Sequence, residues 1–375
     1  MRIVQISTFI GPGSGVAGVA WALEREFRAA GHEVESFTYE RARSLRRRRP
    51  PRHRITERIA QVWRLWWFST VGTGRARRFL ADRPDAVSVC HGNVMAGDVF
   101  VDHGIMSATM RANGDPLWRR WGNPNQWFVS VRDHLRYRSA AHRVVVVPTA
   151  DEGRTLRRVY GRVRPSVEVI PHGVDLERFR PPTPQARSVA RAALLLDPED
   201  RVALFIGHEF ERKGLTIAID ALVMASTVLL LVIGGTAPMV ESARRRAEDA
   251  GVADRVLFVG PQQDLEPFLS AGDVLAFPSA RESSGLVVLE ALASGLPVVS
   301  TRVGVAVDVI LDGVNGYLVD RDPQSFAEAL ELIAATEPGV WGVRARASVE
   351  GLSWHHTAER YIDLFERVRR ERSAA

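Results

Sequence analysis

Short apolar runs alternate with longer amphipathic stretches along the whole chain of 375 residues. In the first half, the apolar runs predict strands at residues 3–7, 34–39, 86–90, 99–102, 144–148 and 167–170, with helical patterns such as 16–30 and 155–160 between them. The second half repeats this order, with strands predicted at 202–206, 228–233, 256–259, 274–277 and 298–300 and helices at 215–225, 240–250, 264–271, 286–293 and 323–335. Strands rich in Val, Ile and Leu that alternate with helices are typical of parallel sheets covered on both faces.

A proline-rich segment at residues 178–184 separates the two halves. At roughly 100–200 residues per domain, a chain of this length corresponds to two domains. We therefore expect an α/β protein with two Rossmann-like domains at residues 1–178 and 185–355. A charged helix with one apolar face, at residues 356–375, is expected to pack back on the first domain. Ligands of such sheets bind beyond the carboxyl ends of the strands, so the functional loops should face an interdomain cleft.

The composition excludes several classes of protein. The hydrophobic fraction of 46% and the charged fraction of 25% are ordinary for a globular chain. A single cysteine, Cys90, excludes an intrachain disulfide framework and a four-cysteine zinc site. The first residues alternate like a strand and lack the pattern of a signal peptide, and the longest apolar run, 228–233, is far shorter than the roughly 20 residues of a membrane span. We expect a cytoplasmic protein.

Positive charge is concentrated in one segment of the chain. The net charge is +6, yet residues 41–58 carry nine arginines against the single acid Glu57, and aromatic residues follow at 63 and 66–68. An arginine near an anionic membrane contributes about 1 kcal/mol to binding, and tryptophan favours membrane interfaces. We therefore expect residues 41–68 to attach reversibly to an anionic membrane surface, such as the inner face of the plasma membrane. Nucleic-acid binding and a disordered loop are the alternatives.

Glycines crowd the loop after the first predicted strand. Gly13, Gly15 and Gly18 have the G-x-G-x-x-G spacing of dinucleotide-binding proteins, and Glu40 follows the second strand, where a ribose-binding acid would stand. A dinucleotide fold turns almost directly from strand to glycine, however, whereas several residues intervene here. The loop is expected to contact phosphate or sugar, with NAD binding and a merely flexible turn as alternatives.

The chain has 50 basic side chains other than histidine, and Lys213 is its one lysine. Lys213 follows Arg212 in a loop that starts with Gly207, after the first strand of the second half. Glycine lets a ligand approach the backbone closely. A guanidinium fork beside a compact ammonium suits a diphosphate. A solvated charged turn is the plain alternative, but the placement of the one lysine favours a ligand site.

Two glutamates, Glu282 and Glu290, bracket the start of a predicted helix. The helix begins near Ser284, so the free amides of Gly285 and Leu286 form an anion site. Helical spacing separates the two glutamates by up to about 12 Å, which suits the two ends of a nucleotide-sugar. Stabilisation of the helix dipole is the simple alternative for Glu282. Glu290 lies in an apolar run, where a carboxylate is costly unless it binds something.

Three histidines follow predicted strands of the first half: His91, His103 and His172. A lone histidine is more often structural than functional. Asp102 and His103 are the best catalytic candidates, because they offer a carboxylate and an imidazole together at one strand end. No metal-ligand spacing occurs in the chain, so we expect neither a metal nor a cofactor.

These motifs together resemble the retaining family-4 glycosyltransferases of GT-B fold. The resemblance rests on Gly207 with Arg212-Lys213-Gly214, on Glu282 and Glu290 as E-x7-E, and on residues 170–175, 295–300 and 313–316. Residues 210–215 and 283–290 look most like the lipopolysaccharide-core glucosyltransferase branch. Two positions depart from the family pattern: His172 stands where Asn is usual, and residues 283–285 replace the Phe-Gly that follows the first glutamate.

The resemblance implies a role for each candidate residue. Arg212 and Lys213 would bind the donor diphosphate, Glu282 would lie near the donor-sugar hydroxyls, and Glu290 would bind the nucleotide ribose. Asp102 and His103 would lie near the donor sugar or the acceptor. The remaining donor contacts would come from Gly13, Gly15, Gly207, Gln263 near the base, Ser284, Gly285 and Leu286.

The resemblance also implies the reaction. A hexosyl unit would pass with retention from a nucleotide-sugar, UDP- or GDP-linked, to a membrane-proximal or lipid-linked glycan acceptor. Attack on the same face of the sugar is expected, because no residue is an obvious covalent nucleophile. An NAD-dependent oxidoreductase built on the Gly13–Gly18 loop is one alternative, but it leaves Lys213 and both glutamates without a role. A basic membrane- or nucleic-acid-binding protein is the other, and the leading interpretation expects no nucleic acid.

Overall fold

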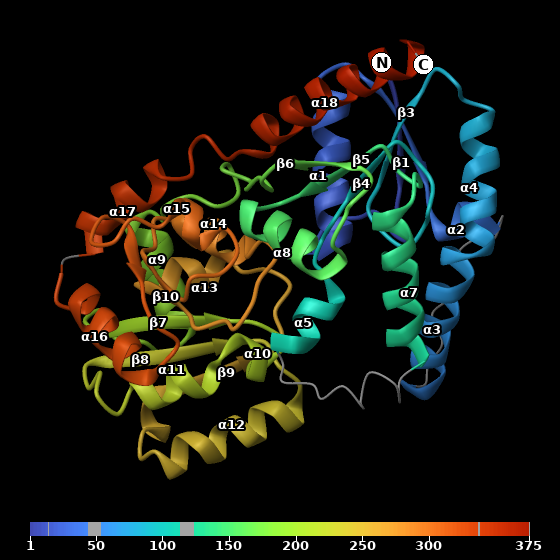
Figure 1. The fold of residues 1–375 in the computed structure, drawn as a ribbon. Helices are drawn as coiled ribbons and strands as arrows, with labels where there is room; N and C mark the ends of the chain where they lie inside the picture. The colour runs from blue at the N-terminus through green and yellow to red at the C-terminus, as the bar shows by residue number, and fades with distance from the viewer. Residues whose placement is uncertain (14, 44–53, 113–123, 337, 375) are drawn as a thin grey trace. The chain divides into compact units, whose positions relative to one another are not determined.

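The computed structural model describes residues 1–13, 15–43, 54–112, 124–336 and 338–374. Contacts divide the chain into two compact units, Met1–His172 with Trp354–Ala375, and Gly173–Ser353. Each unit contains one six-stranded sheet whose paired strands are all parallel. Figure 1 shows each sheet with helices packed against it. The expected fold class, α/β with two Rossmann-like domains, is confirmed.

The first unit builds its sheet from strands that are mostly continuous apolar runs. The strands are β1 (Arg2–Ile6), β2 (Glu33–Phe37), β3 (Val87–Cys90), β4 (Val99–Val101), β5 (Val144–Val147) and β6 (Ser166–Val169), in the order β2-β1-β3-β4-β5-β6. The helices are α1 (Gly15–Ala29), α2 (Tyr39–Arg43), α3 (Arg54–Ser69), α4 (Val71–Ala81), α5 (Met106–Ala112), α7 (Pro124–Arg138), α8 (Ala150–Tyr160) and α18 (Trp354–Ala374).

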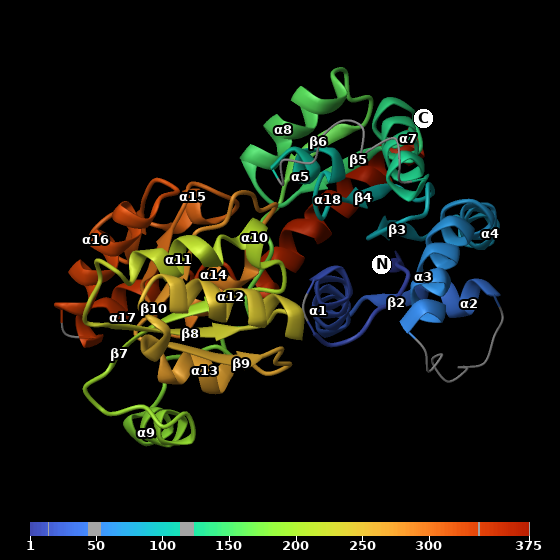
Figure 2. The same ribbon diagram turned by 90° about the horizontal axis from the view of Figure 1, so that it is seen from below.

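Both faces of this sheet are covered. Phe68, Tyr137 and Leu156, from α3, α7 and α8, join one buried cluster with the strands. On α1 and α18, the ring of Phe27 packs against those of Tyr361 and Phe365. Helix α18 therefore belongs to the first unit although it ends the chain, and Figure 2 shows it against this sheet.

The second unit repeats the pattern with a different strand order. Its strands are β7 (Arg201–Ile206), β8 (Val228–Ile233), β9 (Val256–Gly260), β10 (Val274–Phe277), β11 (Val298–Ser300) and β12 (Gly316–Leu318), in the order β12-β11-β10-β7-β8-β9. Its α-helices are α9 (Pro184–Ala193), α10 (Phe210–Lys213), α11 (Leu215–Ala221), α12 (Ala237–Asp249), α13 (Glu266–Ala271), α14 (Leu286–Ala293), α15 (Ala306–Val309), α16 (Pro323–Ala334) and α17 (Pro338–Ala347), with a 3-10 turn at Ala253–Arg255.

Alternate residues of β7 enter two separate cores. Leu204 lies in a cluster with residues of α9, α13, α14 and α17, whereas Phe205 lies in a cluster with residues of α11, α12 and α16. The two groups of helices occupy opposite faces of the sheet in Figure 1. Because β7 and β10 are neighbours in the middle of the sheet, the loops that follow them leave from adjacent points.

The division between the units falls at residues 172 and 173, before the proline-rich segment at which the sequence placed it. The Val174 amide donates to the Leu352 carbonyl oxygen at 2.8 Å. The Arg346 guanidinium donates to the carbonyl oxygens of Leu176 and Phe179. These bonds attach residues 173–180 to the second unit. Among the described helices, none is both long enough and apolar enough to cross a bilayer.

Candidate active site

The loop after β7 holds Arg212 and Lys213 against the end of β10. A Cβ on Gly214 would lie 2.2 Å from the Pro278 carbonyl oxygen, so only glycine, here at a φ of +79°, allows this close approach. A Cβ on Gly207 would lie 2.9 Å from Cγ of Lys213, so Gly207 leaves room for the lysine stem. The Ala280 amide donates to the Arg212 carbonyl oxygen at 2.9 Å, which joins the two loops directly.

The cationic pair and the first glutamate meet at one oxygen atom. Oε1 of Glu282 lies 2.7 Å from Nζ of Lys213 and 2.9 Å from Nη1 of Arg212. The Ser279 hydroxyl donates to the same oxygen at 2.8 Å. The Lys213 ammonium also lies 4.6 Å from the centroid of the Phe277 ring, within range of a cation–π interaction. Residues from two loops thus form one ionic cluster at the carboxyl ends of β7 and β10.

Electrostatics keep Glu282 ionised in this cluster. Burial on its own would raise the pKa of the Glu282 carboxyl, but the charges of Lys213 and Arg212 outweigh it and hold that pKa below its usual range. Arg212 has a second acidic partner, Glu209, at the start of its own turn. The side chain of Glu209 is 61% exposed, against 11% for Glu282. Glu282 is therefore the closely held counter-ion of the pair.

Glu290 differs from Glu282 in having no such partner. It is half-buried on α14, and no described residue donates a hydrogen bond to its carboxylate. Burial raises the pKa of Glu290 to about 7, although the charges of Arg178 and Lys213 oppose this shift. A carboxylate in such a place is costly unless a ligand supplies donors. Glu290 thus has the properties of a ligand-binding residue.

The start of α14 lies next to this cluster. Gly285 precedes the helix with a φ of +87°, and no side chain caps the helix. The first amides of α14, beginning at Leu286, are therefore positioned as an anion site. The Ser284 carbonyl oxygen accepts a hydrogen bond from the Val305 amide at 2.6 Å, which fixes the loop. Gln263 is exposed after β9 and is not part of the ionic cluster.

The glycine loop lies in the first unit. β1 ends at Ile6 and α1 begins at Gly15, so the strand does not turn directly into the helix as in a dinucleotide fold. A Cβ on Gly18 would lie 1.9 Å from the Gly13 carbonyl oxygen. The glycine at position 18 therefore lets the loop fold back on the first turn of α1, and the backbone around Gly13 and Gly15 stays open.

The three histidines lie in a row within the first unit. Nδ1 of His91 is 3.4 Å from Nε2 of His103, and the ring centroids of His103 and His172 are 5.6 Å apart. Trp354 of α18 follows in the same row, with its ring centroid 6.2 Å from that of His172. Burial lowers the pKa of His91 to about 3, that of His172 to about 4 and that of His103 well below its usual value. All three imidazoles are therefore neutral at physiological pH.

Asp102 and His103, which follow one another at the end of β4, contact different side chains. The Asp102 carboxylate accepts hydrogen bonds from the Tyr137 hydroxyl and the Gly104 amide, both at 3.2 Å. Successive side chains of an extended segment point in opposite directions, which sends His103 to the histidine row instead. Burial raises the pKa of Asp102 to about 7, and nearby Glu152 adds to the shift.

Several contributors to these sites were not predicted. Ser279 orients Glu282 through its hydroxyl group. In the sequence, the position of Ser279 just after a strand was the one sign of this role. Arg136, fully buried on α7, stacks over the Phe100 ring at 4.0 Å and donates to the carbonyl oxygens of Gly92 and Val94. It thereby fixes the loop next to His91, a role that an arginine in a basic chain does not reveal.

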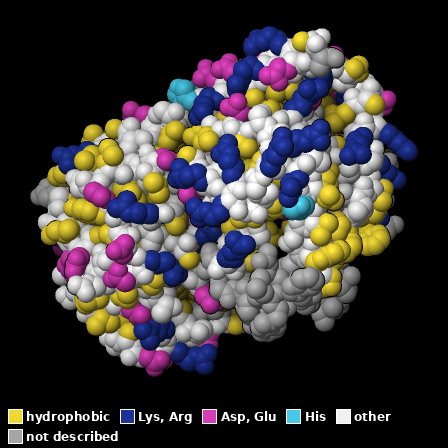
Figure 3. Space-filling view, viewed as in Figure 1, with side chains coloured by type: hydrophobic (Ala, Val, Ile, Leu, Met, Phe, Trp, Pro, Cys, Tyr) yellow, Lys and Arg dark blue, Asp and Glu magenta, His cyan; other side chains and the backbone are white. Residues whose placement is uncertain are grey.

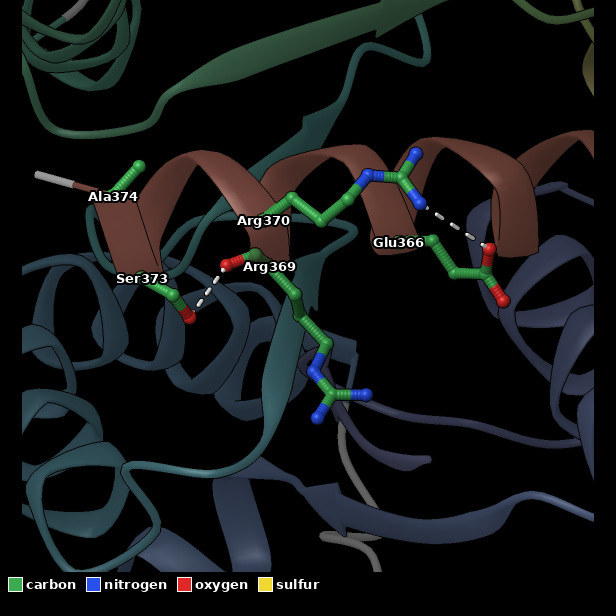
Figure 4. Close-up of a pocket in the computed structure, with 5 residues that line it drawn as sticks. All are labelled: Glu366, Arg369, Arg370, Ser373 and Ala374. Atoms are coloured by element: carbon green, nitrogen blue, oxygen red, sulfur yellow. Dashed lines mark hydrogen bonds and ion pairs between the residues drawn. The ribbon is translucent and has the colours of Figure 1, made fainter.

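An open depression of about 520 Å³ also lies along α18 (Figure 4). Its lining residues are Glu366, Arg369, Arg370, Ser373 and Ala374. They come from one helix, Arg370 is paired with Glu366 at 3.9 Å, and no strand end contributes. Among the described residues, no three His, Cys, Asp or Glu side chains converge as metal ligands.

Comparison with known families accounts for both units. Residues 187–346 match the model of "Glycosyl transferases group 1", and residues 13–178 match that of "Glycosyltransferase Family 4". The chain belongs to the family-4 glycosyltransferases. Most residues of each unit of this glycosyltransferase thus lie within a family model.

Curated relatives agree with this assignment. The chain is 36% identical over 247 residues to a D-inositol 3-phosphate glycosyltransferase of Xylanimonas cellulosilytica, which covers 63% of this chain and 59% of that protein. It is 35% identical over 240 residues to the protein of the same name from Nocardia farcinica, covering 59% of this chain and 52% of the relative. The matched region therefore spans only between half and three fifths of these relatives.

Solved structures confirm the GT-B fold. WaaG, a glycosyltransferase of lipopolysaccharide biosynthesis, has a TM-score of 0.74 at 20% identity, over 97% of this chain and 99% of that one. The sucrose-phosphate synthase of Thermosynechococcus elongatus has a TM-score of 0.75 at 22% identity, over the full length of both chains. Anabaena HepE in complex with UDP and glucose has a TM-score of 0.68 at 19% identity, covering 98% of this chain and 100% of that chain. At these identities the likeness concerns the fold alone, so the resemblance to the lipopolysaccharide-core branch stays a prediction.

Proposed function

We propose that the chain transfers a hexosyl unit from a nucleoside diphosphate sugar to an acceptor hydroxyl, with retention of anomeric configuration. The observation that carries the proposal is the ionic cluster of Arg212, Lys213 and Glu282 at the ends of β7 and β10. It lies where ligands of parallel sheets bind, beyond the carboxyl ends of central strands. The unpartnered carboxylate of Glu290 and the uncapped start of α14 adjoin it in sequence and support a nucleotide-sugar as the ligand.

The proposed mechanism follows from the charge that develops. Cleavage of the bond between the anomeric carbon and the phosphate oxygen leaves a nucleoside diphosphate, whose negative charge Arg212 and Lys213 stabilise. The acceptor oxygen bonds to the anomeric carbon on the same face, and its proton passes to the departing phosphate oxygen. Glu282 accepts hydrogen bonds from the sugar hydroxyls, and Glu290 accepts them from the ribose. The side chains provide the positive charge, and the proposal requires neither a metal nor a cofactor.

Two kinds of acceptor are candidates for the proposed reaction. A membrane-proximal or lipid-linked glycan follows from the membrane surface proposed below. The relatives named D-inositol 3-phosphate glycosyltransferase favour a second candidate, an inositol phosphate. The test incubates the purified chain with UDP- and GDP-hexoses and either a glycolipid or inositol 3-phosphate, and follows the products by proton NMR. A product with the donor's anomeric configuration supports the proposal, and an inverted product contradicts it.

We also propose that the first unit attaches to an anionic membrane. The predicted segment 41–68 falls partly on residues 44–53, which lie outside the described part of the chain. In its described part, Arg41 and Arg43 are engaged within the protein: Arg41 donates to the Ser36 carbonyl oxygen and Arg43 to the Tyr39 hydroxyl. These two arginines are therefore weaker candidates for lipid contact than the sequence suggested.

Helices α3 and α7 add apolar surface to this segment. The rings of Trp66 and Phe128 stack at 4.2 Å and join the two helices. On the same two helices, Trp63, Trp127 and Leu135 are 59%, 55% and 53% exposed. Figure 3 shows apolar side chains gathered over α7 beside several arginines. Exposed tryptophan next to positive charge is typical of membrane interfaces.

Vesicle sedimentation tests the membrane proposal. The chain should pellet with vesicles that contain phosphatidylglycerol and not with pure phosphatidylcholine, and salt should weaken the binding. Replacing Trp63 and Trp127 by serine should weaken binding further, whereas replacing exposed Val343 of the second unit should not. Equal binding to both kinds of vesicle would contradict the proposal.

A further inference from the structure

The cations assigned to the donor diphosphate are already neutralised within the second unit. Arg212 and Lys213 contribute two positive charges, and their ion-pair partners Glu282 and Glu209 contribute two negative charges. The formal charge of the four side chains is therefore zero. A nucleoside diphosphate approaching this cluster meets cations whose attraction is balanced by carboxylates, so strong binding requires a counter-ion to give way.

The two counter-ions are not equivalent. Among the described side chains, Glu209 pairs with Arg212 alone, and because Glu209 is 61% exposed, water screens this pair and its contribution is small. Glu282 is 11% exposed and contacts both cations through one oxygen, Oε1. The Ser279 hydroxyl bonds to that same oxygen. The position of the Glu282 carboxylate thus decides whether Arg212 and Lys213 are available to bind a diphosphate.

We propose that Glu282 is an exchangeable counter-ion: the donor diphosphate takes its place on Arg212 and Lys213, and the released carboxylate accepts hydrogen bonds from the donor-sugar hydroxyls. This inference rests on the proposed function and adds to it a means of discrimination. A nucleoside diphosphate without a sugar removes the partners of Glu282 and supplies none in return. A complete donor supplies hydroxyl donors, so the exchange favours the donor over the spent nucleoside diphosphate.

The exchange predicts that substitution of Glu282 changes the affinities for the nucleoside diphosphate and for its sugar conjugate differently. In Glu282→Gln the cations lose their closely held counter-ion, so a nucleoside diphosphate should bind at least about tenfold more tightly than to the wild type. The amide cannot replace a carboxylate as acceptor for several hydroxyls, so the sugar conjugate should gain less or lose affinity. A residue that only contacted the sugar would leave the affinity for the nucleoside diphosphate unchanged, and a merely structural one would weaken both ligands.

The experiment is calorimetric titration of the full chain with inorganic diphosphate, with UDP, GDP and ADP, and with the common hexose conjugates of the nucleotide that binds. The matched control is Glu209→Gln, which removes the exposed counter-ion of the same cluster. It should change the affinity for nucleoside diphosphate and conjugate alike, by less than about threefold. Glu282→Ser is a second charge-removing variant that guards against a rearrangement caused by the glutamine side chain.

Each outcome is decisive. A tighter nucleoside diphosphate complex in both Glu282 variants, with a smaller gain or a loss for the conjugate, supports the exchange. Binding of the nucleoside diphosphate that is no tighter than in the wild type overturns it and leaves the proposed function intact. If the wild type binds neither inorganic diphosphate nor any of the three nucleotides, the proposed function fails and the exchange fails with it.

Discussion

Replacing Lys213 by alanine removes one of the two charges assigned to the donor diphosphate and leaves the core of the second unit in place. The Lys213 side chain is 14% exposed, with its ammonium 2.7 Å from Glu282 and 4.6 Å from the centroid of the Phe277 ring. After the substitution, Arg212 at 2.9 Å and Ser279 at 2.8 Å still hold the Glu282 oxygen. The carboxylate therefore keeps two of its three partners.

The expected cost to stability is smaller than the cost to catalysis. Removing one partner of a buried ion pair costs about 3–5 kcal/mol when the other charge is left uncompensated. With two partners remaining, we expect about 1–2 kcal/mol, similar to one hydrogen bond to a charged group. A unit of this size loses about 2–4 °C of melting temperature per kcal/mol. Loss of a preorganised charge at the leaving group, in contrast, lowers kcat by about 10²–10³.

The assay measures release of nucleoside diphosphate at saturating donor, together with a thermal melt of the same preparation. Arg246→Ala is the control, since it breaks an exposed pair with Asp220, at 2.7 and 2.8 Å, on another surface of the same unit. Its kcat should be unchanged. Lys213→Arg should not restore the rate, because a planar guanidinium does not replace a compact ammonium. A folded Lys213→Ala protein with kcat within about tenfold of the wild type would refute the diphosphate assignment.

Three further predictions concern single side chains. Burial raises the pKa of Glu290 from its usual 4.5 to about 7, so the folded state holds this proton more strongly than the unfolded state. The free energy of unfolding should therefore fall as pH rises from 4.5 through 7, by up to about 3 kcal/mol. In urea unfolding, Glu290→Gln should remove this loss and be more stable than the wild type at pH 8, while its nucleotide binding, followed by calorimetry, weakens. Burial lowers the pKa of His172 from its usual 6.5 to about 4, so the folded state favours the neutral imidazole. The contribution of neutral His172 to the free energy of unfolding is complete above pH 6.5 and is lost as pH falls towards 4, by about 1.4 kcal/mol per pH unit. His172→Asn should reduce the pH dependence of the urea midpoint in that window, and an unchanged slope would contradict the burial argument. Because a Cβ on Gly18 would lie 1.9 Å from the Gly13 carbonyl oxygen, Gly18→Ala should lower the free energy of unfolding by about 1–3 kcal/mol, measured by thermal unfolding. The control Gly74→Ala lies at an open position within α4 and should raise the free energy of unfolding by about 0.5–1 kcal/mol. Equal effects of the two substitutions would contradict the close approach at Gly18.

The strands of both sheets were predictable because most are buried on both faces and therefore read as continuous apolar runs. β5 is the clearest case, since its four valines, Val144–Val147, are all buried. β12, Gly316–Leu318, was missed because a run of three residues that begins with glycine is too short to show an apolar strand pattern. Pairing with β11 makes this segment a strand. Helix α9, Pro184–Ala193, begins at the end of the proline-rich segment, and Thr183 in that segment caps it.

The sequence singled out Arg212, Lys213 and Glu282 one by one, but not the ionic cluster that joins them. Arg212 and Glu282 are 70 positions apart, and they meet because β7 and β10 are neighbours in the sheet. Strand order is a property of the whole fold and leaves no local mark on either loop. Asp102 and His103 are adjacent along the chain, yet Asp102 contacts Tyr137 and His103 contacts His91. The extended backbone separates the two side chains, so sequence neighbours here contact different partners.

Nucleotide binding is the decisive measurement for the proposed donor site. A thermal-shift panel would compare UDP, GDP, ADP, their hexose conjugates and NAD on the purified chain. A ligand at about 100 times its dissociation constant should add about 2.7 kcal/mol of stability. We expect one nucleoside diphosphate series to stabilise the wild type, this stabilisation to be lost in Lys213→Ala, and NAD to have no effect. Stabilisation by NAD alone would contradict this expectation, because the glycine loop of the first unit would then be the ligand site.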